Sequence, residues 1–64
     1  MEIDKIIREK IFDEVFIKTG KKVRNVFSIG LLFDGTKIFA VCGNSNNIFA
    51  ITKVDNQNNI EIII

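Results

Sequence analysis

FSIGLLFDGTKIFAVC, residues Phe27 to Cys42, decides the fold, because two apolar runs flank a turn signal in it. Isoleucine, valine and phenylalanine dominate both runs, and these residue types favour β-strands. An Asp-Gly pair between such runs is a strong signal for a two-residue type I′ turn, in which both residues have a positive φ. We therefore predict a β-hairpin with Asp34-Gly35 as its turn and with Phe33 paired to Thr36.

This register divides the side chains of the hairpin between two faces, because directly paired residues share a face. The face predicted to be the core consists of Phe27, Ile29, Leu31, Phe33, Ile38, Ala40 and Cys42. The other face should be in water in a two-layer protein, yet it also carries large apolar residues. These residues indicate a second buried surface. It is either an intermolecular interface, which we favour, or a face covered within the chain because the helix and residues 23–30 wrap the sheet from both sides. Its predicted residues are Val26, Leu32, Phe39 and Val41.

Upstream of the hairpin, residues 3–18 are predicted to form an amphipathic helix. Isoleucine or valine recurs every four residues from Ile3 to Val15, which places these side chains on one stripe. Thr19-Gly20 is expected to end the helix, because glycine readily adopts the left-handed conformation of a helix C-terminus.

Downstream, polar turns are predicted at 44–47 and 55–59, where asparagine is frequent. They separate two further strands, at 48–54 and 60–64. The predicted fold class is α+β: residues 1–64 form one small domain, with an N-terminal helix packed on a four-stranded antiparallel β-meander.

The composition indicates how so small a domain could be stabilised. The chain has 64 residues, one cysteine and no histidine. Domains of this size are marginally stable and commonly gain stability from disulfides, metals or oligomerisation. One cysteine excludes a disulfide within the chain, and a metal would have only Cys42 and carboxylates as ligands, so we expect no metal and no cofactor. Oligomerisation and dense packing are left, and a composition with 47% apolar residues favours both.

Charge and hydropathy bear on location and partners. The net charge of +1 creates no overall field toward nucleic acid or an anionic membrane. The apolar runs are too short to span a bilayer, and the first residues lack the pattern of a signal peptide. A lone free cysteine is typical of a reducing compartment. The expectation is therefore a cytoplasmic protein without a membrane partner.

Few residues are candidates for catalysis. Cys42 is the only strong nucleophile, but the chain has no histidine to act as its base, and the predicted register points Cys42 into the core. Glu9 and Asp13 lie one helical turn apart, but lysines and arginine intersperse them, which is typical of a solvated helix face. We expect no catalytic residue and no enzymatic activity.

Four cations lie within seven residues at the predicted corner between the helix and the first strand: Lys18, Lys21, Lys22 and Arg24. Such a patch suits the contact of a phosphate backbone or an acidic partner. The remainder of the chain is slightly acidic, so nucleic-acid binding through this patch should be weak.

Two function classes follow from the sequence. The first is a non-enzymatic protein-interaction module that self-associates, as a homodimer or a larger assembly, and/or binds and inhibits a larger protein. Its size and composition fit a small inhibitor encoded by a phage or another mobile element. The alternative is a small nucleic-acid-binding protein that uses the basic corner from Lys18 to Arg24.

Overall fold

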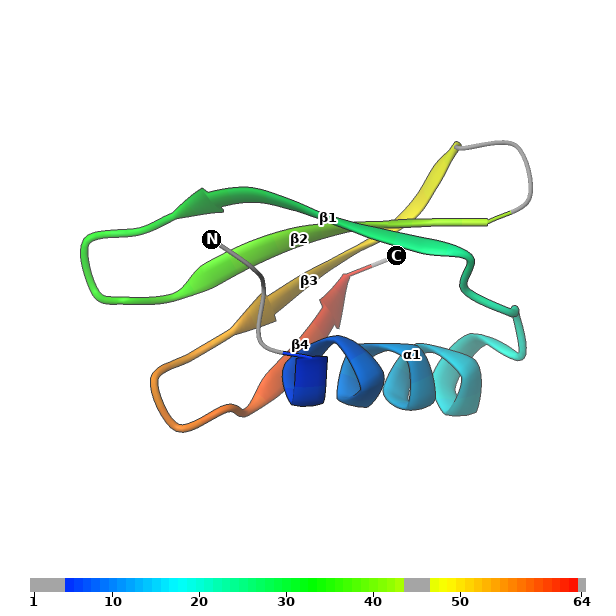
Figure 1. The fold of residues 1–64 in the computed structure, drawn as a ribbon, viewed down its shortest axis with the longest axis horizontal. Helices are drawn as coiled ribbons and strands as arrows, with labels where there is room; N and C mark the ends of the chain where they lie inside the picture. Colours follow the sequence, from blue (N-terminus) through cyan, green and yellow to red (C-terminus); the bar gives the residue numbers. More distant parts are fainter. Residues whose placement is uncertain (1–4, 44–46, 64) are drawn as a thin grey trace.

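A computed structural model describes residues 5–43 and 47–63. The helix α1 (Lys5–Thr19) comes first. The strands that follow it are β1 (Asn25–Leu31), β2 (Lys37–Cys42), β3 (Ile48–Val54) and β4 (Ile60–Ile63). The strands form one antiparallel sheet in the order β1-β2-β3-β4, so the predicted helix-then-meander fold is confirmed (Figure 1).

Parts of three predicted elements lie outside the described residues. These are residues 3 and 4 of the helix, residues 44–46 of the turn between the second and third strands, and residue 64 of the fourth strand.

The helix covers one face of the sheet and lies closest to β4 (Figure 1). Ile7, Ile11 and Val15, spaced one helical turn apart, are its buried residues, as the periodicity predicts. At its C-terminus the Gly20 N–H donates to the Phe16 carbonyl at 2.8 Å, and Gly20 has a φ of 73°. This is the predicted left-handed stop.

The turn between β1 and β2 differs from the prediction by one residue. The Leu32 N–H donates to the Thr36 carbonyl at 2.8 Å, and the Gly35 N–H donates to the Leu32 carbonyl at 3.0 Å. Leu32 rather than Phe33 therefore closes the hairpin opposite Thr36, and the predicted Phe33–Thr36 pairing is wrong. The loop has three residues and ends in a left-handed glycine, Gly35, with a φ of 91°. This turn needs a positive φ only at the glycine, whereas the predicted type I′ turn needs one at Asp34 as well.

The pairing of β1 with β2 shifts by a further residue between Ser28 and Gly30, so Phe27 shares a face with Ala40, as predicted. Helix α1 covers the other face of the sheet: Val26, Phe39 and Val41 are buried in the core beneath it, and Phe39 is only 1% exposed. The expectation that these three residues lie on an uncovered face is wrong. Leu32, the fourth residue of the predicted interface, is exposed.

Cys42 is buried, as predicted, and shares its face with Ala40, because both alternate along β2 with Phe39 and Val41. This face is not the one that α1 covers: neither residue belongs to the core cluster under the helix. The predicted core face and the predicted outer face are thus exchanged.

Phe39→Ala is expected to lower the free energy of unfolding by about 3–5 kcal/mol, because truncating a buried phenylalanine leaves a cavity. Phe33→Ala is the matched control. Its side chain is fully exposed, so we expect a change below about 0.5 kcal/mol. Urea unfolding followed by circular dichroism measures both, and equal losses in the two variants would contradict this assignment of the faces.

Candidate protein-interaction surface

The face of the sheet opposite α1 carries a continuous apolar row. The register places Phe27 opposite Ala40, Ala40 opposite Ile51, and Ile51 opposite Ile63. These four side chains share a face and cross all four strands. Phe27 and Ile63 are exposed and Ile51 is half-buried, whereas the small Ala40 is buried. Among the described residues, no helix or strand lies over the row.

A second row runs beside the first on the same face. It consists of Gly30, Ile38, Lys53 and Glu61, which are paired in that order across the four strands. The two rows together are called the open face below. The open face contains one cation and one anion, so its net charge is zero.

Apolar side chains are also exposed on α1, but they are not continuous. Ile6 is separated from Phe16 and Ile17 by nearly three helical turns, and the exposed residues between them are mostly charged. Single apolar residues on a surface are ordinary, whereas a contiguous patch marks an interaction site. The open face is therefore a stronger candidate than α1, although Ile29, Leu31 and Phe33, along β1 and in its turn, are also exposed.

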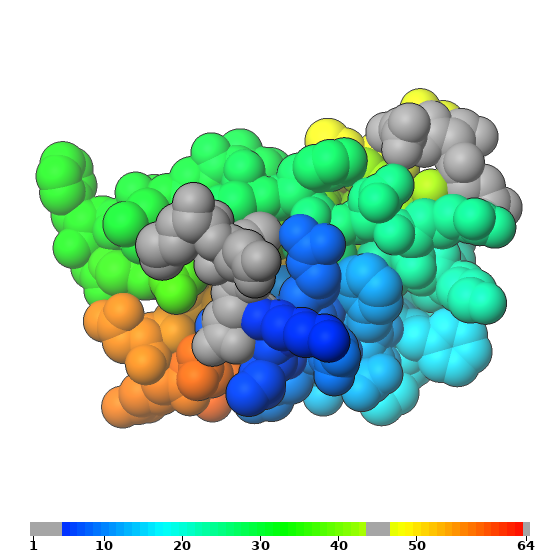
Figure 2. All heavy atoms as spheres, in the orientation of Figure 1, coloured from blue at the N-terminus to red at the C-terminus, as the bar shows by residue number. Residues whose placement is uncertain are grey.

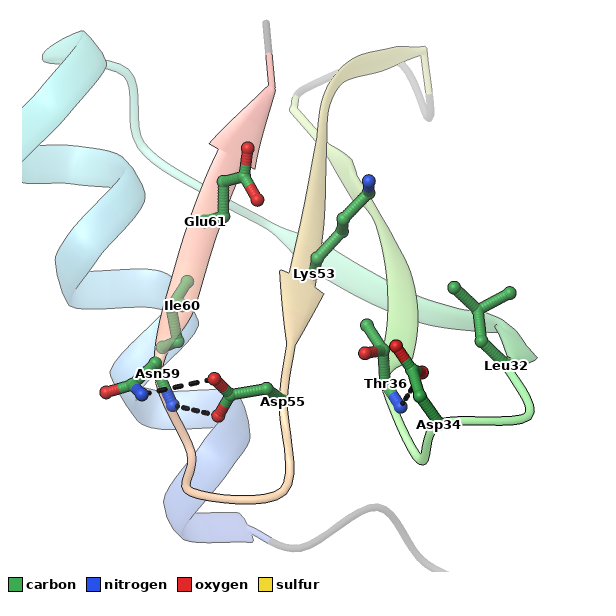
Figure 3. Close-up of a pocket in the computed structure, with 8 residues that line it drawn as sticks. All are labelled: Leu32, Asp34, Thr36, Lys53, Asp55, Asn59, Ile60 and Glu61. Atoms are coloured by element: carbon green, nitrogen blue, oxygen red, sulfur yellow. Dashed lines mark hydrogen bonds between the residues drawn. The ribbon is translucent and has the colours of Figure 1, made fainter.

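An open groove of about 370 Å³ lies at one end of the open face (Figure 3). The turns after β1 and after β3 and the adjoining strands form it. Its lining residues are Leu32, Asp34, Thr36, Lys53, Asp55, Asn59, Ile60 and Glu61. Since Lys53 and Glu61 belong to both, the groove forms a polar rim of the open face.

The two aspartates of the groove are held by their own turns (Figure 3). The Asp34 carboxylate accepts a hydrogen bond from the Thr36 N–H at 3.0 Å, which lowers the pKa of Asp34. The Asp55 carboxylate accepts one from the Asn59 N–H at 2.9 Å, which lowers the pKa of Asp55, and another from the Gln57 N–H at 2.8 Å. Within residues 5–43 and 47–63, no group of histidine, cysteine, aspartate and glutamate is placed to hold a metal ion.

Asn56 joins the two turns. Its side-chain Nδ2 donates to the Asp34 carbonyl at 3.0 Å, across a sequence separation of 22 residues. The Asn56 amide also lies so close to Gly35 that a Cβ atom there would collide with it. Gly35 thus serves both the left-handed turn and the approach of Asn56, and the rim of the open face is built from two connected loops.

Gly35→Ala is expected to destabilise the protein more than Gly20→Ala. Both glycines have a positive φ, which costs alanine about 1–2 kcal/mol, but a Cβ at Gly20 would meet nothing within 4 Å. Asn56→Ala removes the obstructing amide. In that background, Gly35→Ala should therefore lower the free energy of unfolding no more than Gly20→Ala does. A double-mutant cycle from urea unfolding should give a coupling of at least about 0.5 kcal/mol between Gly35→Ala and Asn56→Ala. Additive losses would contradict the contact.

The four cations of the predicted basic corner are all exposed. Lys18 is in the last turn of α1, and Lys21, Lys22 and Arg24 are in the connection to β1. The Lys21 Nζ lies 5.4 Å from the ring centroid of Phe49, a cation–π distance. In Figures 1 and 2 this connection (cyan to turquoise) is at the opposite end of the molecule from the turns that form the groove (green and orange).

The other residues considered for chemistry are not brought together. Glu9 and Asp13 are exposed on α1, and the thiol of Cys42 is buried. Cys42 is on the face of the sheet that α1 does not cover. The sheet therefore separates its thiol from Glu9 and Asp13 on α1.

Sequence reasoning placed the main residues of the open face in the core. Phe27, Ile38 and Ala40 were expected under the helix, and Ile51 and Ile63 were not assigned to either face. The triplet Phe33-Asp34-Gly35 could have indicated the three-residue loop, but this loop alone would pair Phe27 with Val41. The observed pairing of Phe27 with Ala40 needs the further shift between Ser28 and Gly30, and no local signal indicates which face the helix covers.

Comparisons with models of protein families, with curated proteins and with solved structures find no match. In the described part of the chain, no helix is long and apolar enough to cross a lipid bilayer.

Proposed function

We propose that this protein is a non-enzymatic interaction module that associates with itself through the open face. The observation that carries the proposal is the row Phe27, Ala40, Ile51 and Ile63, which crosses all four strands on the face that α1 leaves uncovered. Burial of this row would add apolar area that a domain of 64 residues cannot bury alone.

The chemistry of the open face favours a protein as its partner. Lys53 is balanced by Glu61 in the neighbouring strand, so the face does not attract the phosphates of nucleic acid or anionic lipid. An apolar centre with a polar rim is typical of protein–protein interfaces, and the groove supplies such a rim. A larger protein that this module inhibits could use the same face, in place of a second copy.

Phe27→Asp is expected to abolish self-association and leave the fold intact, because Phe27 is 51% exposed and a charge there would be desolvated in the assembly. Light scattering coupled to size exclusion measures the mass, and circular dichroism checks the fold. Each copy of the substitution at the interface should reduce the free energy of association by at least about 2 kcal/mol. This corresponds to roughly a 30-fold increase in the dissociation constant.

Phe16→Asp is the matched control. Phe16 is 55% exposed on α1 and so carries the same side chain at nearly the same exposure on the other layer. It should leave the mass unchanged. A wild-type protein that is monomeric over the whole accessible concentration range, or dissociation by Phe16→Asp alone, would contradict the proposal.

Nucleic-acid binding through the basic corner is the second candidate function. It is supported by the four exposed cations, which gather at the end of the molecule away from the aspartates of the groove. The open face and the corner are separate, so both functions are compatible.

The charge reversals Lys18→Glu with Lys22→Glu test this second candidate. Lys5→Glu with Lys10→Glu makes the same change of net charge elsewhere on α1, where both lysines are exposed. Fluorescence anisotropy with labelled single-stranded RNA and duplex DNA, between 50 and 200 mM salt, should show weak, salt-dependent binding that only the corner variant loses. Equal losses in both variants would indicate net charge alone and contradict a site at the corner.

A further inference from the structure

We propose that the basic corner binds single-stranded nucleic acid, with the Phe49 ring as the surface on which one base stacks and with Lys21 as a contact of the adjoining phosphate. This inference rests on the second candidate function, since it names the class of nucleic acid that the corner takes. The sequence between Lys18 and Arg24 contains no aromatic residue, and the fold brings Phe49 to the corner.

A β-bulge in β3 turns the Phe49 ring toward the corner. The pairing of β2 with β3 shifts between Val41 and Cys42, and Phe49 is the residue of β3 that has no residue opposite it in β2. Phe49 packs against the core cluster under α1, to which the next residue, Ala50, also belongs. Successive side chains of a regular strand point to opposite faces, so only the bulge allows both to lie on the helix side. The ring also lies against Gly43, where a Cβ would come within 3.3 Å of it.

Lys21 lies over this ring. Its Nζ is 5.4 Å from the ring centroid. The Lys21 N–H donates to the Thr19 hydroxyl at 3.1 Å, and the Arg24 N–H donates to the Cys42 carbonyl at 2.9 Å. Both ends of the connection from α1 to β1 are therefore tied to the helix and to the sheet, and the cation and the aromatic ring are side by side before a ligand binds.

A nucleobase is expected to replace the ammonium group on the ring. Lys21 is exposed and Phe49 is half-buried, so a movement of the flexible lysine side chain uncovers the ring. An exposed cation–π contact is weaker than the stacking of a base on an aromatic ring, and the released ammonium group gains a phosphate as its partner. In a duplex the bases are already stacked on one another, so the ring discriminates in favour of a single strand.

The sign of the charge around the corner agrees with a phosphate backbone. Residues 15–33 contain the four cations and no acid, and residues 38–52 contain no charged residue. The end of α1, the connection to β1 and the adjoining ends of β2 and β3 come from these two stretches. The aspartates of the groove are at the opposite end of the molecule (Figure 2). A strand at the corner therefore meets cations without a neighbouring carboxylate from these stretches.

Fluorescence anisotropy of Phe49→Leu tests the stacking. Leucine keeps an apolar side chain against the core cluster and removes the aromatic face. The affinity for a labelled oligouridylate should fall at least about 5-fold, and the affinity for duplex DNA of the same length should not change. The slope of log affinity against log salt concentration should stay as in the wild type, because stacking releases no counterions. Lys21→Gln should make that slope shallower by about 0.7, the share of one phosphate contact on a single strand.

Phe12→Leu is the matched control. Phe12 is half-buried like Phe49 and packs against the same core cluster, so the two substitutions disturb the packing alike. Phe12→Leu should leave the affinity for oligouridylate unchanged, and circular dichroism checks that both variants are folded. An equal loss in the two variants would assign the effect to packing and overturn the inference.

The remaining outcomes separate the stacking site from the candidate function. If Lys18→Glu with Lys22→Glu abolishes binding while Phe49→Leu has no effect, the corner binds nucleic acid but the stacking site is wrong. A duplex that binds as tightly as the single strand also overturns the inference. A wild-type protein that binds neither nucleic acid would remove the candidate function itself.

Discussion

The packing of the single helix α1 on one face of the sheet determines most of what this protein presents to its surroundings. Leu32 and Thr36 close the β1–β2 hairpin, and Gly35 adopts the left-handed conformation within it. The pairing of β1 with β2 shifts again between Ser28 and Gly30, so Phe27 shares a face with Ala40 and Ile38. Because α1 covers the other face, Val26, Phe39 and Val41 form the core, and Phe27 and Ile38 lie on the uncovered face.

The β1–β2 turn connects the core to the candidate binding surface. Asn56 reaches across from the β3–β4 turn to the Asp34 carbonyl, and the absence of a side chain at Gly35 makes room for it. The two loops therefore support each other at the end of the sheet, and Lys53 and Glu61 extend their groove onto the open face. A binding surface built on paired strands and connected turns is positioned more firmly than one built on loops alone.

The two ends of the molecule differ in charge. Asp34 and Asp55 are in the turns at one end, and their hydrogen bonds to backbone N–H groups hold their pKa values below the ordinary range. Lys18, Lys21 and Lys22 are at the other end, at the corner that leads from α1 to β1. The uncharged apolar row lies between them on the open face. Charged ends and a neutral centre suit an interface whose apolar part supplies affinity and whose charges restrict orientation.

The amino-acid sequence alone determined the helix, the order of the strands, the antiparallel meander and the burial of Cys42. These features depend on local signals: the spacing from Ile7 to Val15, the glycine at the helix end, and the asparagine-rich turns. The choice of face depended on tertiary structure. Both faces of the hairpin are apolar, with Phe39 on one and Phe27 on the other, so the alternation of residues could not distinguish core from surface. Only the docking of a single helix, which covers one face of the sheet, decides which of the two apolar faces becomes the core.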